Sequence, residues 1–233
     1  MVCARVRAGV GPVSLAGAVE DALCKHGADP VLRGIGVQHG LPPFPAPMCV
    51  SVNDVAVNGV PGCEPLADGD RVTVDVACAV DGWHADHAAT IVVTETGSVP
   101  DRSTGEVLKR VVASIRIGEP VDNVYQAYLG GCQQVGGYPV AEAVLHGIGR
   151  CLHEPPTLFD GAAEPAGVRF ETGMLLAVEP VVADRPASLE TLGDGWSRRL
   201  VGGGLAGYEE RTVFLSEQGP IVLTGPGRFR GSG

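Results

Sequence analysis

The sequence predicts an α+β protein in which antiparallel strands make up most of the sheet. Runs rich in β-branched residues lie at 48–60, 72–80 and 83–94, and Asp81-Gly82 between the last two is a strong signal for a tight hairpin. Other stretches have helical periodicity, and no linker or low-complexity segment divides the chain. One α+β domain over residues 1–233 is therefore expected.

The spacing of apolar residues predicts where the helices lie. Leu15 and Val19 recur on one helical face of residues 13–26, and Ser14 can cap the first turn of that helix. Helices are expected over 13–26, 103–116 and 122–134, and further strands over 139–146, 172–182 and 208–216.

Composition and charge narrow the class of protein. The chain has 233 residues, of which 45% are hydrophobic and 19% charged, so it can bury a sizeable core. Its formal net charge is -10. An acidic surface repels phosphate backbones and anionic lipid, so we expect neither nucleic acid nor a membrane as a partner.

The cysteines indicate a reducing compartment. There are seven of them, an odd number, and no two form a CxxC pair, so the sequence predicts neither a zinc knuckle nor a disulfide framework. The N-terminal residues also lack the apolar segment of a signal peptide. A cytoplasmic location is therefore expected.

Two aspartates in the strand-like runs point to a metal ion. Asp75 lies inside the β-branched run 72–80, where a carboxylate lowers strand propensity and its burial is costly. Asp86 follows across the predicted hairpin, so the two side chains are expected to face each other on paired strands. Carboxylates that close repel each other unless a cation or a shared proton lies between them.

Three further residues extend this pattern. His146 precedes Gly147-Ile148-Gly149, Glu179 ends an apolar run, and Glu210 begins another. One acid alone is more often a hydrogen-bonded strand residue than a ligand, but four carboxylates and one imidazole together form an oxygen-rich site. Such a site suits Mn²⁺, Fe²⁺, Co²⁺ or Zn²⁺. Bridging carboxylates can hold two ions about 3.5–4 Å apart, as in dinuclear hydrolases.

Six segments together resemble the signature segments of type I methionine aminopeptidases, in the same order. They are SVNDVAVNGVPG (51–62), VTVDVACAVDGWHAD (72–86), LHGIGRCLHEPP (145–156), GMLLAVEP (173–180), GW (195–196) and YEERT (208–212). The resemblance runs from about Val10 to Thr224. It implies a pita-bread fold, in which two similar halves with a curved antiparallel sheet, covered by helices, surround a dinuclear metal site.

The resemblance also implies a role for each residue. Asp75 would chelate one ion and His146 the other, while Asp86 and Glu210 would bridge them. Glu179 would bind the His146 ion and act as general base, and His153 would hydrogen-bond the substrate amide. The pocket for the first side chain would be lined by Phe44, Cys49, Leu152 and Trp196. The implied enzyme is a hydrolase that removes the N-terminal methionine of peptides through a metal-bridging hydroxide.

One departure from the family leaves the substrate open. Asn58 stands where the family has a substrate-side histidine, and an amide can donate a hydrogen bond but cannot carry a proton near neutral pH. The alternative is therefore a specialised metalloenzyme of the same fold that acts on a small amide or pathway intermediate. A catalytically silent binding scaffold is a third reading, which the complete set of five ligands argues against.

A second departure concerns the N-terminus. The family has a long helix before the segment that begins here near Val10. Lack of that helix would expose apolar surface, so we expect a homodimer or a partner protein to cover it. Residues 225–233 are expected to form a flexible tail.

Overall fold

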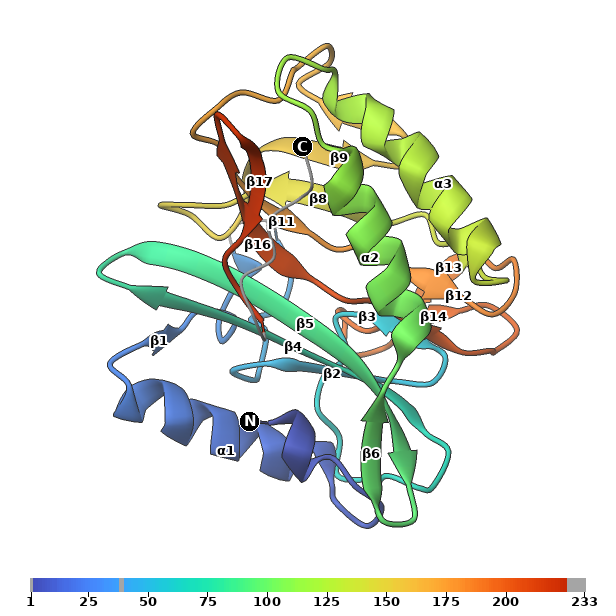
Figure 1. Ribbon diagram of the computed structural model, residues 1–233. Coiled ribbons are helices and arrows are strands. Elements are labelled where there is room, and N and C mark those ends of the chain that lie inside the picture. The colour runs from blue at the N-terminus through green and yellow to red at the C-terminus, as the bar shows by residue number, and fades with distance from the viewer. Residues whose placement is uncertain (1, 38–39, 226–233) are drawn as a thin grey trace.

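The computed structural model describes residues 2–37 and 40–225, and it confirms the predicted α+β architecture. Two antiparallel sheets lie between helices: α1 (Pro12–Lys25) runs along one side of the molecule, and α2 (Arg102–Ser114) and α3 (Val124–Gln134) along the other (Figure 1). All three predicted helices are present, each shifted by one or two residues. The predicted tail lies outside the described residues, apart from Gly225.

The first sheet is built on one long hairpin. Its strand order is β1 (Asp29–Pro30), β4 (Arg71–Val80), β5 (Trp83–Thr94) and β6 (Gly97–Pro100), with β2 (Cys49–Val52) also paired with β4. Asp81 and Gly82 connect β4 to β5 with φ values of 52° and 73°. Two left-handed residues are what a two-residue hairpin turn requires, so the predicted turn is confirmed.

The alternation of side chains along β4 separates core from site. Val72 and Val74 pack against Leu15 and other residues of α1 in one buried cluster. Asp75 follows Val74 directly, so its side chain lies on the opposite face of the sheet. Burying an aliphatic side chain of this size stabilises the fold by about 1.5–3 kcal/mol, so the α1 face fixes which way Asp75 points.

The second sheet carries the other half of the molecule. Its order is β10 (Ala162–Glu164), β9 (Glu154–Phe159), β8 (Ala143–Gly147), β11 (Leu175–Val178), β16 (Arg211–Ser216) and β17 (Gly219–Val222). Helices α2 and α3 cover it (Figure 1), and their buried residues share one hydrophobic cluster with Leu176 and Val213 of the sheet. Asp101 caps α2 by accepting from the Ser103 amide at 2.9 Å, and it pairs with Arg71 at 2.7 Å.

Two small sheets and two short helices complete the described fold. One small sheet joins β15 (Ala206–Gly207), β12 (Val182–Ala183) and β7 (Tyr138–Pro139), and the other joins β13 (Leu189–Thr191), β14 (Arg198–Leu200) and β3 (Val55–Val57). The 3₁₀ turns η1 (Cys3–Arg5) and η3 (Val121–Asn123) precede α1 and α3. No described helix has both the length and the apolar character that a membrane span needs.

Several predicted strand bounds were wrong. The run 139–146 splits into β7 and β8, and 172–182 splits into β11 and β12, because the chain turns between sheets at these points. Residues 208–210 precede β16 rather than belong to it. They still run beside β5, where the Glu210 amide donates to the Ala88 carbonyl at 3.0 Å. The two sheets therefore meet along β5.

Candidate metal centre

The β4–β5 hairpin places two of the predicted ligands on one face. Asp75 pairs with Ala88 and Asp86 pairs with Ala77, so the aspartates are diagonal neighbours. The expectation was that the two side chains face each other on paired strands, and the register of the hairpin offsets them by two residues. Diagonal neighbours on one face of a sheet are about 7–8 Å apart at Cα, which still lets their carboxyl groups converge on a common point.

The second sheet contributes the other three ligand candidates. His146 lies in β8, Glu179 directly follows β11, and Glu210 directly precedes β16. The two glutamates lie outside regular pairing but are held by their backbones: the Glu179 amide donates to Val144 O at 2.8 Å and the Glu210 amide to Ala88 O. Five residues from two sheets thus reach one cavity.

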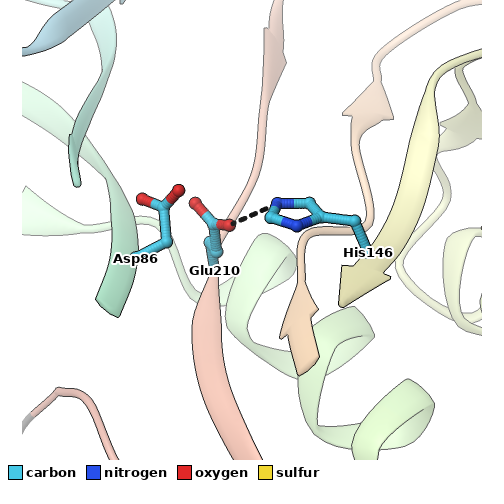
Figure 2. Close-up of side chains that lie close together, drawn as sticks. All are labelled: Asp86, His146 and Glu210. Atoms are coloured by element: carbon cyan, nitrogen blue, oxygen red, sulfur yellow. Dashed lines mark ion pairs between the residues drawn. The ribbon is translucent and has the colours of Figure 1, made fainter. Parts of the chain in front are cut away.

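Three of these side chains form a compact group. Asp86, His146 and Glu210 each offer a ligand atom within 4.8 Å of the other two (Figure 2). In that view Glu210 lies between Asp86 and His146, and its Oε1 is 4.0 Å from His146 Nε2. Glu179 Oε1 approaches the same Nε2 to 3.6 Å. Asp75 is not part of this compact group, although it lines the same cavity.

Hydrogen bonding fixes the tautomer of His146. Its Nδ1 lies 2.8 Å from the Gly147 carbonyl, which can only accept, so Nδ1 carries the proton. Burial, helped by nearby His153, lowers the pKa of His146 to about 4, so the ring is neutral at pH 7. The lone pair of Nε2 therefore points toward Glu179 and Glu210, in the form that a metal ion requires.

Ionisation of the four buried carboxyl groups is unfavourable in the absence of a cation. Burial raises the pKa of Asp86, Glu179 and Glu210 well above the usual range, and each is raised further by the charge of its acidic neighbours. Burial also raises the pKa of Asp75, against the opposing effect of a hydrogen bond from Tyr208. Negative charges buried this close together are stable only when protons or cations compensate them.

One buried oxygen tests whether a metal ion fits. Asp75 Oδ1 is buried and has no hydrogen-bond partner among the described residues. A buried polar atom without a partner costs about 1–3 kcal/mol, and more when it is charged. Four carboxylates with one neutral imidazole are hard donors of the kind that divalent Mn, Fe, Co or Zn binds. The residues present therefore fit a divalent metal.

Backbone and hydroxyl groups hold Asp86 in place. Its amide donates to Thr212 Oγ1 at 2.9 Å, and that hydroxyl donates back to the Asp86 carbonyl at 3.0 Å. The His87 amide donates to Asp86 Oδ1 at 2.9 Å. The His87 ring instead turns to the Glu210 carbonyl, 3.1 Å from Nδ1, as expected for the strand neighbour of an inward-facing residue.

A cavity of about 300 Å³ opens over these ligands. Phe44, Cys49 and Trp196 line it, as predicted, and so do Asn58 and His153. The rings of Phe44 and Trp196 meet edge to face at 5.3 Å, and Trp196 Nε1 donates to Pro42 O at 2.8 Å. Leu152 is not one of the lining residues but packs in the same hydrophobic cluster as Phe44 and Cys49.

Two ionisable residues of the cavity lining, Tyr208 and Glu142, had no role in the sequence prediction. Tyr208 donates its hydroxyl to Asp75 Oδ2 at 2.7 Å. Glu142 faces the cavity and forms an ion pair with Arg198. The position of Tyr208 could have been inferred, because it lies two residues before Glu210 and alternate residues of an extended segment share a face.

Comparison with known proteins agrees with this geometry. The model of metallopeptidase family M24 matches residues 1–214. The methionine aminopeptidase of Clostridium perfringens is 32% identical over 228 residues, covering 94% of this chain and 87% of that protein. Methionine aminopeptidase 1 of Bacillus subtilis is 31% identical over 225 residues, covering 94% and 87%.

A solved structure shares the fold. The crystal structure of the methionine aminopeptidase from Thermotoga maritima superposes with a TM-score of 0.83 at 28% identity, covering 95% of this chain and 90% of that one. The expected pita-bread fold is thereby confirmed. With its family model matched over most of its length and these relatives at about a third identity, the chain belongs to metallopeptidase family M24.

Proposed function

We propose that the protein is a metal-dependent aminopeptidase that hydrolyses the N-terminal methionine from peptides. The observation that carries the proposal is the convergence of Asp75, Asp86, His146, Glu179 and Glu210 on one buried cavity. The relatives named methionine aminopeptidase support the choice of reaction. We further propose that the five residues hold two divalent ions, drawn from Mn, Fe, Co and Zn.

The divalent ions, when bound, would polarise the scissile carbonyl and lower the pKa of a water molecule to about 7. Glu179 is the best placed of the carboxylates to move a proton. Its side chain is 19% exposed, against 2% for Glu210, so it reaches the open part of the cavity.

His153 is the residue we assign to the substrate amide. Its ring packs edge to face on that of His146, with centroids 4.7 Å apart, and it lines the cavity. An imidazole N–H at this position can donate to the amide of the scissile bond and orient it.

The apolar end of the cavity suits methionine. Phe44, Trp196, Leu32 and Ile35 line it. Aromatic and aliphatic walls accept an unbranched thioether, whose sulfur makes favourable contacts with aromatic rings. Burial and the nearby carboxylates raise the pKa of Cys49 well above its usual value, so Cys49 contributes a neutral thiol to this wall.

A second hollow supports a peptide over a small amide. It has a volume of about 510 Å³ and is lined by His153, Glu154, Pro155, Thr157, Glu164 and Pro165. His153 and Thr157 also line the metal cavity, so the two spaces adjoin at the residue assigned to the scissile amide. Residues downstream of the scissile bond therefore have a groove to occupy.

The direct test is release of methionine from Met-Ala-Ser by metal-free protein reconstituted separately with Co²⁺, Mn²⁺, Fe²⁺ and Zn²⁺. Metal-dependent release is the expected result. Tight metal binding without release of methionine would overturn the proposed reaction and favour a small amide or pathway intermediate as substrate.

Replacing Asn58 by histidine is expected to raise kcat for Met-Ala-Ser by at least about 10-fold. A positioned acid–base group contributes about 10²–10⁴ in rate, and Asn58 lines the cavity without being able to carry a proton. Its backbone has φ of 57°, a left-handed conformation that histidine adopts more readily than most residues. Steady-state kinetics of the two proteins, each loaded with the same metal, measure the gain.

Asn58→Ala is the matched control, since it removes the amide without adding a proton carrier. An equal gain in both variants would show that steric relief is responsible. If neither variant is faster, Asn58 does not limit peptide cleavage.

The remaining expectations concern the cellular compartment and the partner proteins. All seven cysteines are free thiols in the fold, which supports the cytoplasm as the compartment we propose. A homodimer or a partner protein stays a prediction.

A further inference from the structure

Tyr208 is buried beside the ligands with its hydroxyl directed at one of them. Its side chain is 1% exposed and packs among Ala56, Val57 and Leu200. The hydroxyl donates to Asp75 Oδ2 at 2.7 Å. A phenol can donate this hydrogen bond, whereas a carboxylate oxygen accepts it, so the contact holds Oδ2 in one place.

The backbone of Tyr208 is held on both sides by one threonine. The Tyr208 amide donates to Thr90 Oγ1 at 2.9 Å, and the same hydroxyl donates to the Tyr208 carbonyl at 2.6 Å. Thr73 lies 2.8 Å from Thr90 Oγ1, within hydrogen-bonding distance of the same oxygen. Hydrogen bonds to residues of β4 and β5 therefore fix the position of the phenol relative to Asp75.

This contact makes the two oxygens of Asp75 unequal. Oδ2 is occupied by the phenol, whereas Oδ1 is buried and has no hydrogen-bond partner among the described residues. A carboxylate held this way presents one defined oxygen to a cation, and hydrogen bonds from outer partners commonly orient metal ligands in this manner.

We propose that Tyr208 is a positioning residue for one of the two metal positions. It turns Asp75 so that Oδ1 is the ligating atom. The inference rests on the metal site proposed above. Tyr208 contacts Asp75, which lies outside the compact group of Asp86, His146 and Glu210, so the main effect is expected at the ion that Asp75 binds.

Tyr208→Phe tests this by removing only the hydroxyl. Metal-free protein is titrated with Co²⁺, and binding is followed by calorimetry and by the visible absorption of the bound ion. We expect the first equivalent to bind as in the unaltered protein. The second should bind about 10–100-fold more weakly, the usual cost of losing an outer partner of a ligand, and its absorption band should change.

Tyr128→Phe is the matched control. Tyr128 is equally buried, and its hydroxyl bonds to the backbone of Val140 and Val181 rather than to a ligand side chain. It should lower the melting temperature and leave both Co²⁺ affinities unchanged. Three results would overturn the role of Tyr208: an unchanged second affinity in Tyr208→Phe, an equal weakening of both ions, or the same weakening in Tyr128→Phe. Failure of the unaltered protein to bind Co²⁺ would instead overturn the metal site itself.

Discussion

Replacing Asp86 by alanine is expected to reduce metal-dependent release of methionine by about 10⁴-fold or more, because the reaction depends on activating water at the site. Asp86 belongs to the compact group with His146 and Glu210. Its carboxylate and backbone are fixed by His87 and Thr212, so its ligand atom is held in place. The measurement is kcat/KM for Met-Ala-Ser with Mn²⁺ or Co²⁺ in excess.

The melting temperature of the Asp86→Ala variant distinguishes a loss of activity at the metal site from misfolding. Asp86 is buried among other acids, so its removal relieves repulsion in the metal-free protein. The metal-free variant should therefore melt no lower than the metal-free parent. Asp68→Ala, at an exposed position, is the matched control and should leave the rate unchanged. A well-folded Asp86→Ala protein that retained a tenth of the activity would contradict the assignment of Asp86 as a ligand.

The metal-free protein is expected to lose stability as pH rises above about 4. Carboxyl groups titrate near pH 4 in the unfolded chain, but the pKa values of Asp86, Glu179 and Glu210 are raised well above that when folded. The folded state thus binds more protons in this range, and its free energy of unfolding falls with pH. This contribution to stability is fully present at low pH, and it is lost as the pH rises through the pKa values of the folded state.

His146 acts in the opposite direction but does not reverse the trend. Its pKa falls from 6.5 to about 4 on folding, so it contributes stability above pH 6.5 that is lost on acidification. Its share is roughly 3 kcal/mol at most, at about 1.4 kcal/mol per pKa unit. One imidazole works against three acids in the same pH range, so the net slope stays negative.

Bound metal should reverse the sign of this pH dependence, so that stability rises with pH. Divalent ions compete with protons for these carboxylates, so binding strengthens as pH rises. At a free concentration about 100 times the dissociation constant, one ion adds about 2.7 kcal/mol to the free energy of unfolding. Urea unfolding at several pH values, with chelator or with excess Mn²⁺, measures both slopes. A metal-free protein that became more stable with rising pH would contradict the electrostatic account.

The hairpin half of the site was predictable because its signals are local. Asp81-Gly82 specified the turn, and the aspartates lay in β-branched runs on either side of it. The turn also determines the register of the two strands. Because the loop has two residues, Val80 pairs with Trp83, and this pairing places Asp75 opposite Ala88. The two-residue offset between the aspartates therefore follows from the hairpin as well.

The other half depended on long-range pairing. Glu179 and Glu210 lie just outside strands, and only the order β8-β11-β16 brings them beside His146. No local pattern specifies that order, so resemblance to the family supplied it. Strand β9 was not predicted because Pro155 and Pro156 argue against a strand, yet it lies next to β8.

The placement of ligands on two sheets has a consequence beyond chemistry. Asp75 and Asp86 belong to the hairpin over α1, whereas His146, Glu179 and Glu210 belong to the half under α2 and α3 (Figure 1). Ions held by all five would fasten the halves together along β5, as a disulfide does, but reversibly. Removing the ions with a chelator would then loosen the contact between the two halves as well as stop the reaction. The rigidity of the enzyme would depend on the concentration of free metal.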